Sequence, residues 1–183
     1  MLDVLRDFDY RIFKIFNGFA GKSVGWDGVF IVAAEYVLFL MLAGLVLFVL
    51  LKEKDKIRWT TALHALASAF IGRAILIPII RMLFFRPRPF ISGAVTQLVS
   101  HNPLEGSFPS AHATVMFALA FSLFFVNVRW ALAYFVLAVL SSFARIVVGV
   151  HFPFDILGGM LVAAFSVLLA KWMFDFWLSK KRK

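Results

Sequence analysis

The sequence predicts an all-α membrane protein: a bundle of about five transmembrane helices preceded by an N-terminal interfacial amphipathic helix. Of its 183 residues, 62% are hydrophobic and only 16% are charged, which is too apolar for a soluble globular domain. The apolar residues gather in five runs that approach or exceed the roughly 20 helical residues needed to cross a bilayer. No stretch shows the alternation typical of a strand. We therefore expect one membrane-embedded domain, residues 1–183.

Residues 1–19 have a different periodicity from the apolar runs. Their apolar residues recur at three- and four-residue steps, with Asp3, Asp7, Arg11 and Lys14 between them. This pattern is typical of an amphipathic helix that lies in the membrane interface. A helix packed on the outer loops of the bundle would give the same pattern, so both arrangements remain open.

Five spans follow in chain order. They are residues 29–51, 59–80, 111–126, 130–150 and 156–178. The third is short and needs help from its neighbours or from local thinning of the bilayer. Residues 81–110, between the second and third spans, are rich in proline and include two glycines. We expect this segment to be an ordered outer loop over a site, since long loops in compact domains are usually functional.

The formal net charge of +9 carries information about topology. Many basic residues fall in 52–58 and 180–183, each beside an apolar run, which argues against a nucleic-acid partner and for membrane lipids. The positive-inside rule places both segments, and with them the C-terminus, in the cytoplasm. We therefore expect a multi-pass membrane protein with residues 81–110 facing outward.

Six polar residues near the ends of apolar runs form one candidate active site. They are Arg81, Arg88, His112, Arg145, His151 and Asp155. Guanidinium groups bind phosphate oxygens, one imidazole can attack phosphorus, and a second can protonate the leaving oxygen. The chain has no cysteine and no acidic cluster that would cage a metal. We therefore expect phosphoryl transfer without a metal or any other cofactor.

The two histidines differ in their surroundings. Asp155 follows His151 by four residues, and a carboxylate that accepts one ring N–H leaves the other ring nitrogen free to attack. His112 opens the third span, where a helix N-terminus favours a phosphate. Ser110, just before it, is expected to be the N-cap, a phosphate donor or both.

These residues stand at the spacing of a known family. The matching segments are Arg81, six residues, Arg88-Pro89; then Pro109-Ser110-Ala111-His112; then Ala144-Arg145, five residues, His151, three residues, Asp155. They resemble the three signatures of the type-2 phosphatidic acid phosphatase (PAP2) superfamily. Arg81, Ala111 and Ala144 replace the usual Lys, Gly and Ser. The resemblance implies that His151 becomes the phosphohistidine and that His112 is the acid.

Within that superfamily the chain looks most like the bacterial undecaprenyl-diphosphate phosphatases associated with bacitracin resistance. The short chain, Ala34-Glu35-Tyr36 and residues 85–90 carry this narrower resemblance. It implies a location in the bacterial cytoplasmic (inner) membrane and hydrolysis, at its outer face, of undecaprenyl diphosphate to undecaprenyl phosphate and phosphate. The alternatives are a phosphatidate or phosphatidylglycerophosphate phosphatase, which would act on a glycerolipid in place of an isoprenoid phosphate, and a non-catalytic lipid-phosphate carrier or sensor.

Further charged residues fall outside these signatures. Glu35 and Arg73 lie at equal depths of roughly 9–10 Å from the outer ends of the first two spans. Because an unpaired charge is costly there, they are expected to pair, either as a contact for a diphosphate or as a buried staple. Arg86 is expected to bind a second phosphate or to face solvent. His101 and Glu105 are expected either on the surface of the outer loop or as contacts of a lid over the site.

Overall fold

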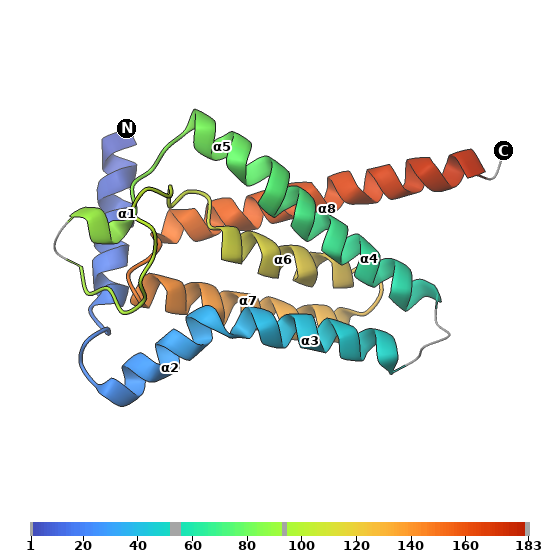
Figure 1. Cartoon of the computed structure of the whole chain (residues 1–183). Helices are drawn as coiled ribbons and strands as arrows, with labels where there is room; N and C mark the ends of the chain where they lie inside the picture. The colour runs from blue at the N-terminus through green and yellow to red at the C-terminus, as the bar shows by residue number, and fades with distance from the viewer. Residues whose placement is uncertain (1, 52–55, 93–94, 182–183) are drawn as a thin grey trace.

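The computed structural model describes residues 2–51, 56–92 and 95–181, and within these ranges it contains helices and no strand. In chain order the elements are α1 (Leu2–Asn17), α2 (Val24–Glu35), α3 (Val37–Leu50), α4 (Lys56–Phe70), η1 (Ile71–Leu76), α5 (Ile77–Leu83), η2 (Pro89–Ser92), α6 (Ala111–Leu123), α7 (Val128–Val147) and α8 (Pro153–Lys181). The predicted class, an all-α membrane protein, is confirmed (Figure 1).

Three helices are long and apolar enough to cross a membrane: Lys56–Leu83, which joins α4, η1 and α5, then Val128–Val147, and Pro153–Trp177. The first predicted run is broken, because α2 and α3 meet at Tyr36 with a bend of 48° and would together form a fourth span. The third run yields only α6, with 13 residues. Five crossings therefore remain a prediction.

Helix α6 is short because it is enclosed by the other helices. It runs through the middle of the bundle, in contact with α4, α7 and α8 (Figure 1), and Met116, Leu119 and Leu123 are fully buried. Two glycines allow this close approach. A Cβ at Gly72 would come within 2.7 Å of Thr114 Cγ2, and one at Gly159 within 2.7 Å of the Ser110 carbonyl oxygen. The N-terminus of α6 is therefore held firmly between its neighbours.

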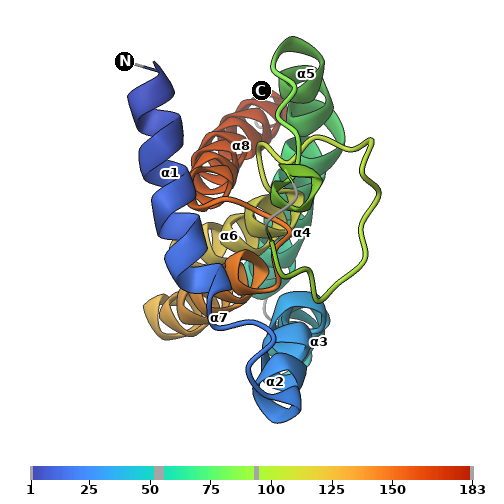
Figure 2. The ribbon, with the colours of Figure 1, turned by 90° about the vertical axis from the view of Figure 1, so that its left-hand side faces the viewer.

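Helix α1 lies across one end of the bundle, in contact with α7 and α8 (Figure 2). Phe13 and Asp9 on its inner face are fully buried. Val4, Phe8 and Ile15 are exposed on its other faces. Helix α1 therefore packs on the bundle through its inner face, and its position in a membrane interface remains a prediction.

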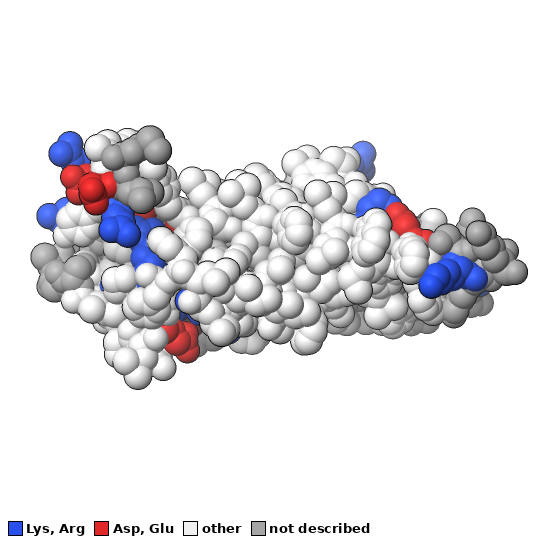
Figure 3. Space-filling view, turned by 90° about the horizontal axis from the view of Figure 1, so that it is seen from above, with Lys and Arg blue, Asp and Glu red and all other residues white. Residues whose placement is uncertain are grey.

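Charged side chains gather at the two ends of the elongated molecule, and the face between them is uncharged over a broad band (Figure 3). One end carries α1 and the loop that joins α5 to α6, and the other carries the start of α4 and the end of α8. Residues 52–55 and 182–183 of the predicted basic segments lie outside the described residues. Such a band fits an inner-membrane protein, and the side that faces the cytoplasm remains a prediction.

Candidate active site

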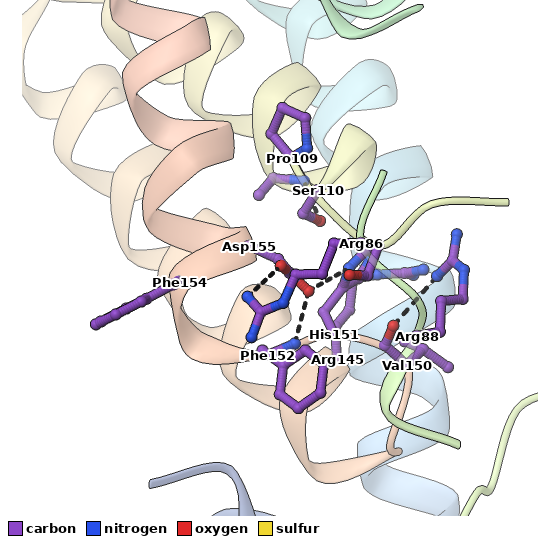
Figure 4. Close-up of polar contacts among 12 residues, drawn as sticks. Arg86, Arg88, Pro109, Ser110, Arg145, Val150, His151, Phe152, Phe154 and Asp155 are labelled. Atoms are coloured by element: carbon purple, nitrogen blue, oxygen red, sulfur yellow. Dashed lines mark hydrogen bonds and ion pairs between the residues drawn. The ribbon is translucent and has the colours of Figure 1, made fainter. Parts of the chain in front are cut away.

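Three segments meet at the end of the bundle that carries α1. They are the loop 84–110, the N-terminus of α6, and the turn 148–152 between α7 and α8 (Figures 1 and 4). The loop begins three residues later than predicted, because Arg81 still belongs to α5, which ends at Leu83. All six residues of the sequence constellation lie on these segments or on the helix ends that adjoin them.

The turn between α7 and α8 positions the proposed nucleophile. Gly149 has φ +83°, and a Cβ there would lie 2.6 Å from the Thr96 carbonyl oxygen, so only glycine fits. Two residues later His151 is buried, with Nδ1 3.5 Å from Oδ2 of the fully buried Asp155. That distance is longer than an ordinary hydrogen bond, as is common for catalytic pairs before substrate binds. The predicted pair is thus brought together.

Three groups hydrogen-bond the carboxylate of Asp155: the Ser107 side chain, the Phe152 backbone and Arg86. Its Oδ2 accepts the backbone N–H of Phe152 at 2.8 Å, and its Oδ1 accepts an N–H of Arg86 at 2.8 Å. Burial lowers the pKa of His151 well below the ordinary 6.5, and the charges of Arg145 and Arg88 act in the same direction. His151 is therefore neutral near pH 7. With its Nδ1 proton toward Asp155, its Nε2 carries a free lone pair.

Ser110 is the N-cap of α6, which was one of the roles expected for it; its role as a phosphate donor stays a prediction. Its Oγ accepts the N–H of Ala113 at 3.5 Å, and its own N–H donates to the Asp155 carbonyl oxygen at 2.9 Å. Ser110 thus ties the start of α6 to α8. His112, in the first turn of α6, is partly exposed and lies within electrostatic range of Arg145 and His151. The second histidine therefore belongs to the same cluster.

The three predicted phosphate-binding arginines surround His151, and the charge of each acts on its imidazole. Arg81 donates to the Pro109 carbonyl oxygen at 3.1 Å, and Arg88 donates to that of Val150 at 3.2 Å. In all three arginines, Arg145 included, the Nε–H is buried and has no hydrogen-bond partner among the described residues. A buried N–H is normally paired, so three such donors around one imidazole are suited to the oxygens of an anion.

The predicted pairing of Glu35 with Arg73 is wrong. Glu35 Oε1 lies 3.0 Å from Nη1 of Arg145, which also donates to the Ala34 carbonyl oxygen at 3.1 Å. The helix breaks directly after Glu35, at Tyr36, so the first run is not the straight helix that the comparison of depths assumed. Arg73 is exposed on η1 and lies within electrostatic range of His112 and Arg81.

Arg86 makes contacts that neither expectation included. Its guanidinium lies between two buried carboxylates, 2.6 Å from Asp9 Oδ2 and 2.8 Å from Asp155 Oδ1. Its Cζ is 4.0 Å from the centre of the Phe152 ring. Arg86 is thus paired with two carboxylates rather than directed to solvent, and binding of a second phosphate stays a prediction. It connects α1 to the carboxylate beside His151, and its contact with Asp155 is drawn in Figure 4.

His101 and Glu105, the two loop residues expected on the surface or in a lid, contact the arginines of the site. His101 Nε2 lies 2.7 Å from Nη2 of Arg145, and Glu105 Oε2 lies 3.5 Å from Nη2 of Arg88. His101 Nδ1 is 2.7 Å from the Ser100 carbonyl oxygen, so the proton belongs on Nδ1 and Nε2 accepts from Arg145. Burial lowers the pKa of His101, which favours this neutral form. No spacing rule in the sequence pointed to either contact.

Within the described residues, no group of three or more His, Asp and Glu is arranged to hold a metal ion. The cluster is instead dominated by guanidinium groups, which suit an anionic substrate. Catalysis without a metal nevertheless remains a prediction, because an assay is needed to test it.

Comparison with known proteins agrees with this geometry. Undecaprenyl-diphosphatase BcrC of Bacillus subtilis is 32% identical over 162 residues, which cover 85% of this chain and 78% of the relative. A lipid A 4'-phosphatase of Bacteroides thetaiotaomicron is 28% identical over 187 residues, which cover 96% and 79%. The crystal structure of Aquifex aeolicus LpxE superposes with a TM-score of 0.67 at 25% identity and covers 88% of this chain and 93% of that one.

The model of the PAP2 superfamily matches residues 59–178, about two thirds of the chain. This region contains all three signatures, from Arg81 to Asp155, and every arginine and histidine of the cluster around His151. The matched region, the motif spacing and the site geometry are consistent with one another, and the chain therefore belongs to the PAP2 superfamily of membrane phosphatases.

Proposed function

We propose that this protein hydrolyses undecaprenyl diphosphate to undecaprenyl phosphate and inorganic phosphate at the outer face of the membrane, through a phosphohistidine. The observation that carries the proposal is the set of three buried, unpaired Nε–H donors of Arg81, Arg88 and Arg145 around a neutral His151. These donors suit the equatorial oxygens of a phosphoryl group in transfer, on which negative charge is spread.

In the first step the lone pair of His151 Nε2 attacks the terminal phosphorus. The P–N bond forms as the bond to the bridging oxygen breaks, and His112 gives its proton to that oxygen, so that lipid monophosphate leaves. Asp155 stabilises the charge on the imidazole ring. In the second step water attacks phosphorus, His112 takes the water proton, and the P–N bond breaks to release phosphate.

A diphosphate, rather than a monophosphate ester, is favoured by the position of Arg73. It is exposed, it lies within electrostatic range of His112, and it is not one of the three arginines around the attacking nitrogen. His112 protonates the leaving group, and therefore a cation within electrostatic range of it is suited to the phosphate that stays on the lipid. Arg73 also lies in a π-helical segment, a feature often found at functional sites.

A lipid A phosphatase is the second candidate, because a relative of that name matches 96% of this chain. The test is phosphate release in detergent from undecaprenyl diphosphate, phosphatidylglycerophosphate, phosphatidate and lipid A. We expect the highest kcat/KM on the diphosphate. Arg73→Ala should impair the diphosphate more than any monophosphate, while Arg129→Ala, an exposed arginine on α7, serves as the control. Preference for a monophosphate, with no selective effect of Arg73, would refute the assignment.

The acid role of His112 has its own test. With a good leaving group such as an aryl phosphate, protonation matters less, so His112→Ala should lose less activity on that substrate than on the lipid. His151→Ala should abolish turnover of both. Equal losses from His112→Ala on the two substrates would contradict its role as general acid.

A further inference from the structure

Arg86 joins two carboxylates that come from opposite ends of the sequence. Asp9 on α1 and Asp155 at the start of α8 are both fully buried, and the guanidinium reaches Asp9 Oδ2 at 2.6 Å and Asp155 Oδ1 at 2.8 Å. The Phe152 ring, whose centre lies 4.0 Å from the guanidinium carbon, covers one face of that group. The half-buried Arg86 can adopt few other positions, because each alternative leaves a buried carboxylate unpaired.

The backbone of the nucleophile's turn binds the same two carboxylates. Asp9 Oδ1 accepts the N–H of Phe154 at 2.9 Å, and Asp155 Oδ2 accepts the N–H of Phe152 at 2.8 Å. Phe13, one turn after Asp9 on α1, packs edge-on against Phe152 with ring centres 5.2 Å apart. Helix α1 is therefore attached to the segment 151–155 by charge, by hydrogen bond and by aromatic contact.

The two oxygens of Asp155 have separate tasks. Oδ2 faces His151 Nδ1 at 3.5 Å, whereas Oδ1 is held by Arg86. The orientation of the carboxylate that faces the nucleophile thus depends in part on where the Arg86 guanidinium lies, together with the hydrogen bonds from the Phe152 backbone and the Ser107 side chain. That position depends in turn on Asp9, the other charged partner of Arg86.

We propose that Asp9 and Arg86 are positioning residues for phosphoryl transfer: Asp9 holds Arg86, and Arg86 holds the Asp155 carboxylate in the orientation that presents His151 to phosphorus. This inference rests on the proposed phosphohistidine mechanism and adds α1, which lies outside the region matched by the family model, to the catalytic apparatus. A structural staple that only fastens α1 would use the same contacts, so the test has to separate the two roles.

The two roles differ in which quantity changes. A displaced nucleophile slows formation of the phosphohistidine whatever the leaving group, so Asp9→Asn should lower kcat by about 10- to 100-fold on lipid and aryl substrates alike, with KM nearly unchanged. Arg86→Lys keeps the positive charge but cannot serve two carboxylates with a planar fork, and it should behave similarly. Asp3→Asn makes the same chemical change at an exposed position of α1 and should leave kcat unaltered.

The experiment measures kcat and KM on both substrates, thermal unfolding in detergent, and calorimetric binding of orthovanadate, which mimics the phosphoryl group in transfer. Orthovanadate affinity should fall in Asp9→Asn and Arg86→Lys and persist in Asp3→Asn, which tests the proposal even if no turnover is found. The positioning proposal would be overturned if the variants lowered Tm but left kcat per folded molecule and orthovanadate affinity unchanged. The contacts would then serve only to fasten α1 to the bundle. Should Asp9→Asn fail to fold, Arg86→Lys carries the test.

The lipid assignment can fail separately. A wild-type protein that cleaves an aryl phosphate but not undecaprenyl diphosphate would refute the proposed substrate, while the losses in Asp9→Asn and Arg86→Lys would still support positioning. Conversely, full activity of both variants on undecaprenyl diphosphate would refute positioning and leave the proposed function intact.

Discussion

Glu35→Ala is expected to destabilise the protein through Arg145. Arg145 is only 1% exposed, and its charged partner, at 3.0 Å, is the Glu35 carboxylate. The variant leaves two neutral acceptors in place, the Ala34 carbonyl oxygen at 3.1 Å and His101 Nε2 at 2.7 Å. The loss is therefore that of one hydrogen bond between charged groups, about 1.5–3 kcal/mol. It stays below the roughly 3–5 kcal/mol expected for a buried charge left with no partner.

Thermal unfolding in detergent provides the measurement. For a chain of this size the loss corresponds to a decrease in Tm of roughly 3–12 °C. In a double-mutant cycle, Glu35→Ala with Arg145→Ala should cost clearly less than the sum of the single changes, because the double variant leaves neither charge unpaired. Glu35→Ala with Arg73→Ala should be additive within about 0.5 kcal/mol. Coupling to Arg73 in place of Arg145 would refute the corrected pairing.

The other expectations concern metal, pH and topology. Phosphate release should persist in EDTA, and strict dependence on added Mg²⁺ would refute the mechanism as written. Burial lowers the pKa values of His101 and His151 below 6.5, so the unfolded chain binds more protons just below that pH, and Tm should fall as pH decreases from about 7 to 5. The fall should be shallower in His101→Gln, and a flat Tm profile in the wild type would contradict this. A cysteine at Asn102, in this cysteine-free chain, should react with an impermeant maleimide in intact cells, and one at Lys56 should not. The reverse pattern would overturn the predicted orientation.

The sequence predicted most of what is local. Apolar runs located the helices because burial in lipid demands them, and motif spacing located His112, Arg145 and His151 because helix ends carry them to one end of the bundle. Partners across the bundle were harder to predict. Depth along a helix gives a position on its axis but not the direction in which a side chain points, and the bend at Tyr36 removes even the straight axis. Glu35 was therefore assigned the wrong arginine.

Asp9 did leave a signal in the sequence. Leu5, Ile12 and Phe16 lie four residues before, three after and seven after it, so it occupies the apolar face of the amphipathic helix. A lone carboxylate on such a face requires a buried cation, although the sequence does not say which one. Arg86 can serve because the loop from α5 returns to the end of the bundle where α1 crosses. That proximity is a property of the assembled fold.

The segment Arg86-Pro87-Arg88 explains how one short stretch can serve both the phosphate and the nucleophile. Proline at 87 fixes its own φ and restricts the backbone of Arg86 before it. Both arginine side chains are therefore attached to a stiff segment of backbone. Arg88 donates to the Val150 carbonyl oxygen at 3.2 Å, just before His151, and Arg86 reaches Asp155, just after it. The two arginines thus hydrogen-bond both ends of the turn that carries His151 (Figure 4). A shift of this loop would therefore move His151 and the phosphate-binding Arg88 together. For that reason a substitution at Pro87 that loosens the segment should lower kcat and weaken phosphate binding in parallel. Asp9→Asn should differ, because on the substrates that turn over it should lower kcat and leave KM nearly unchanged.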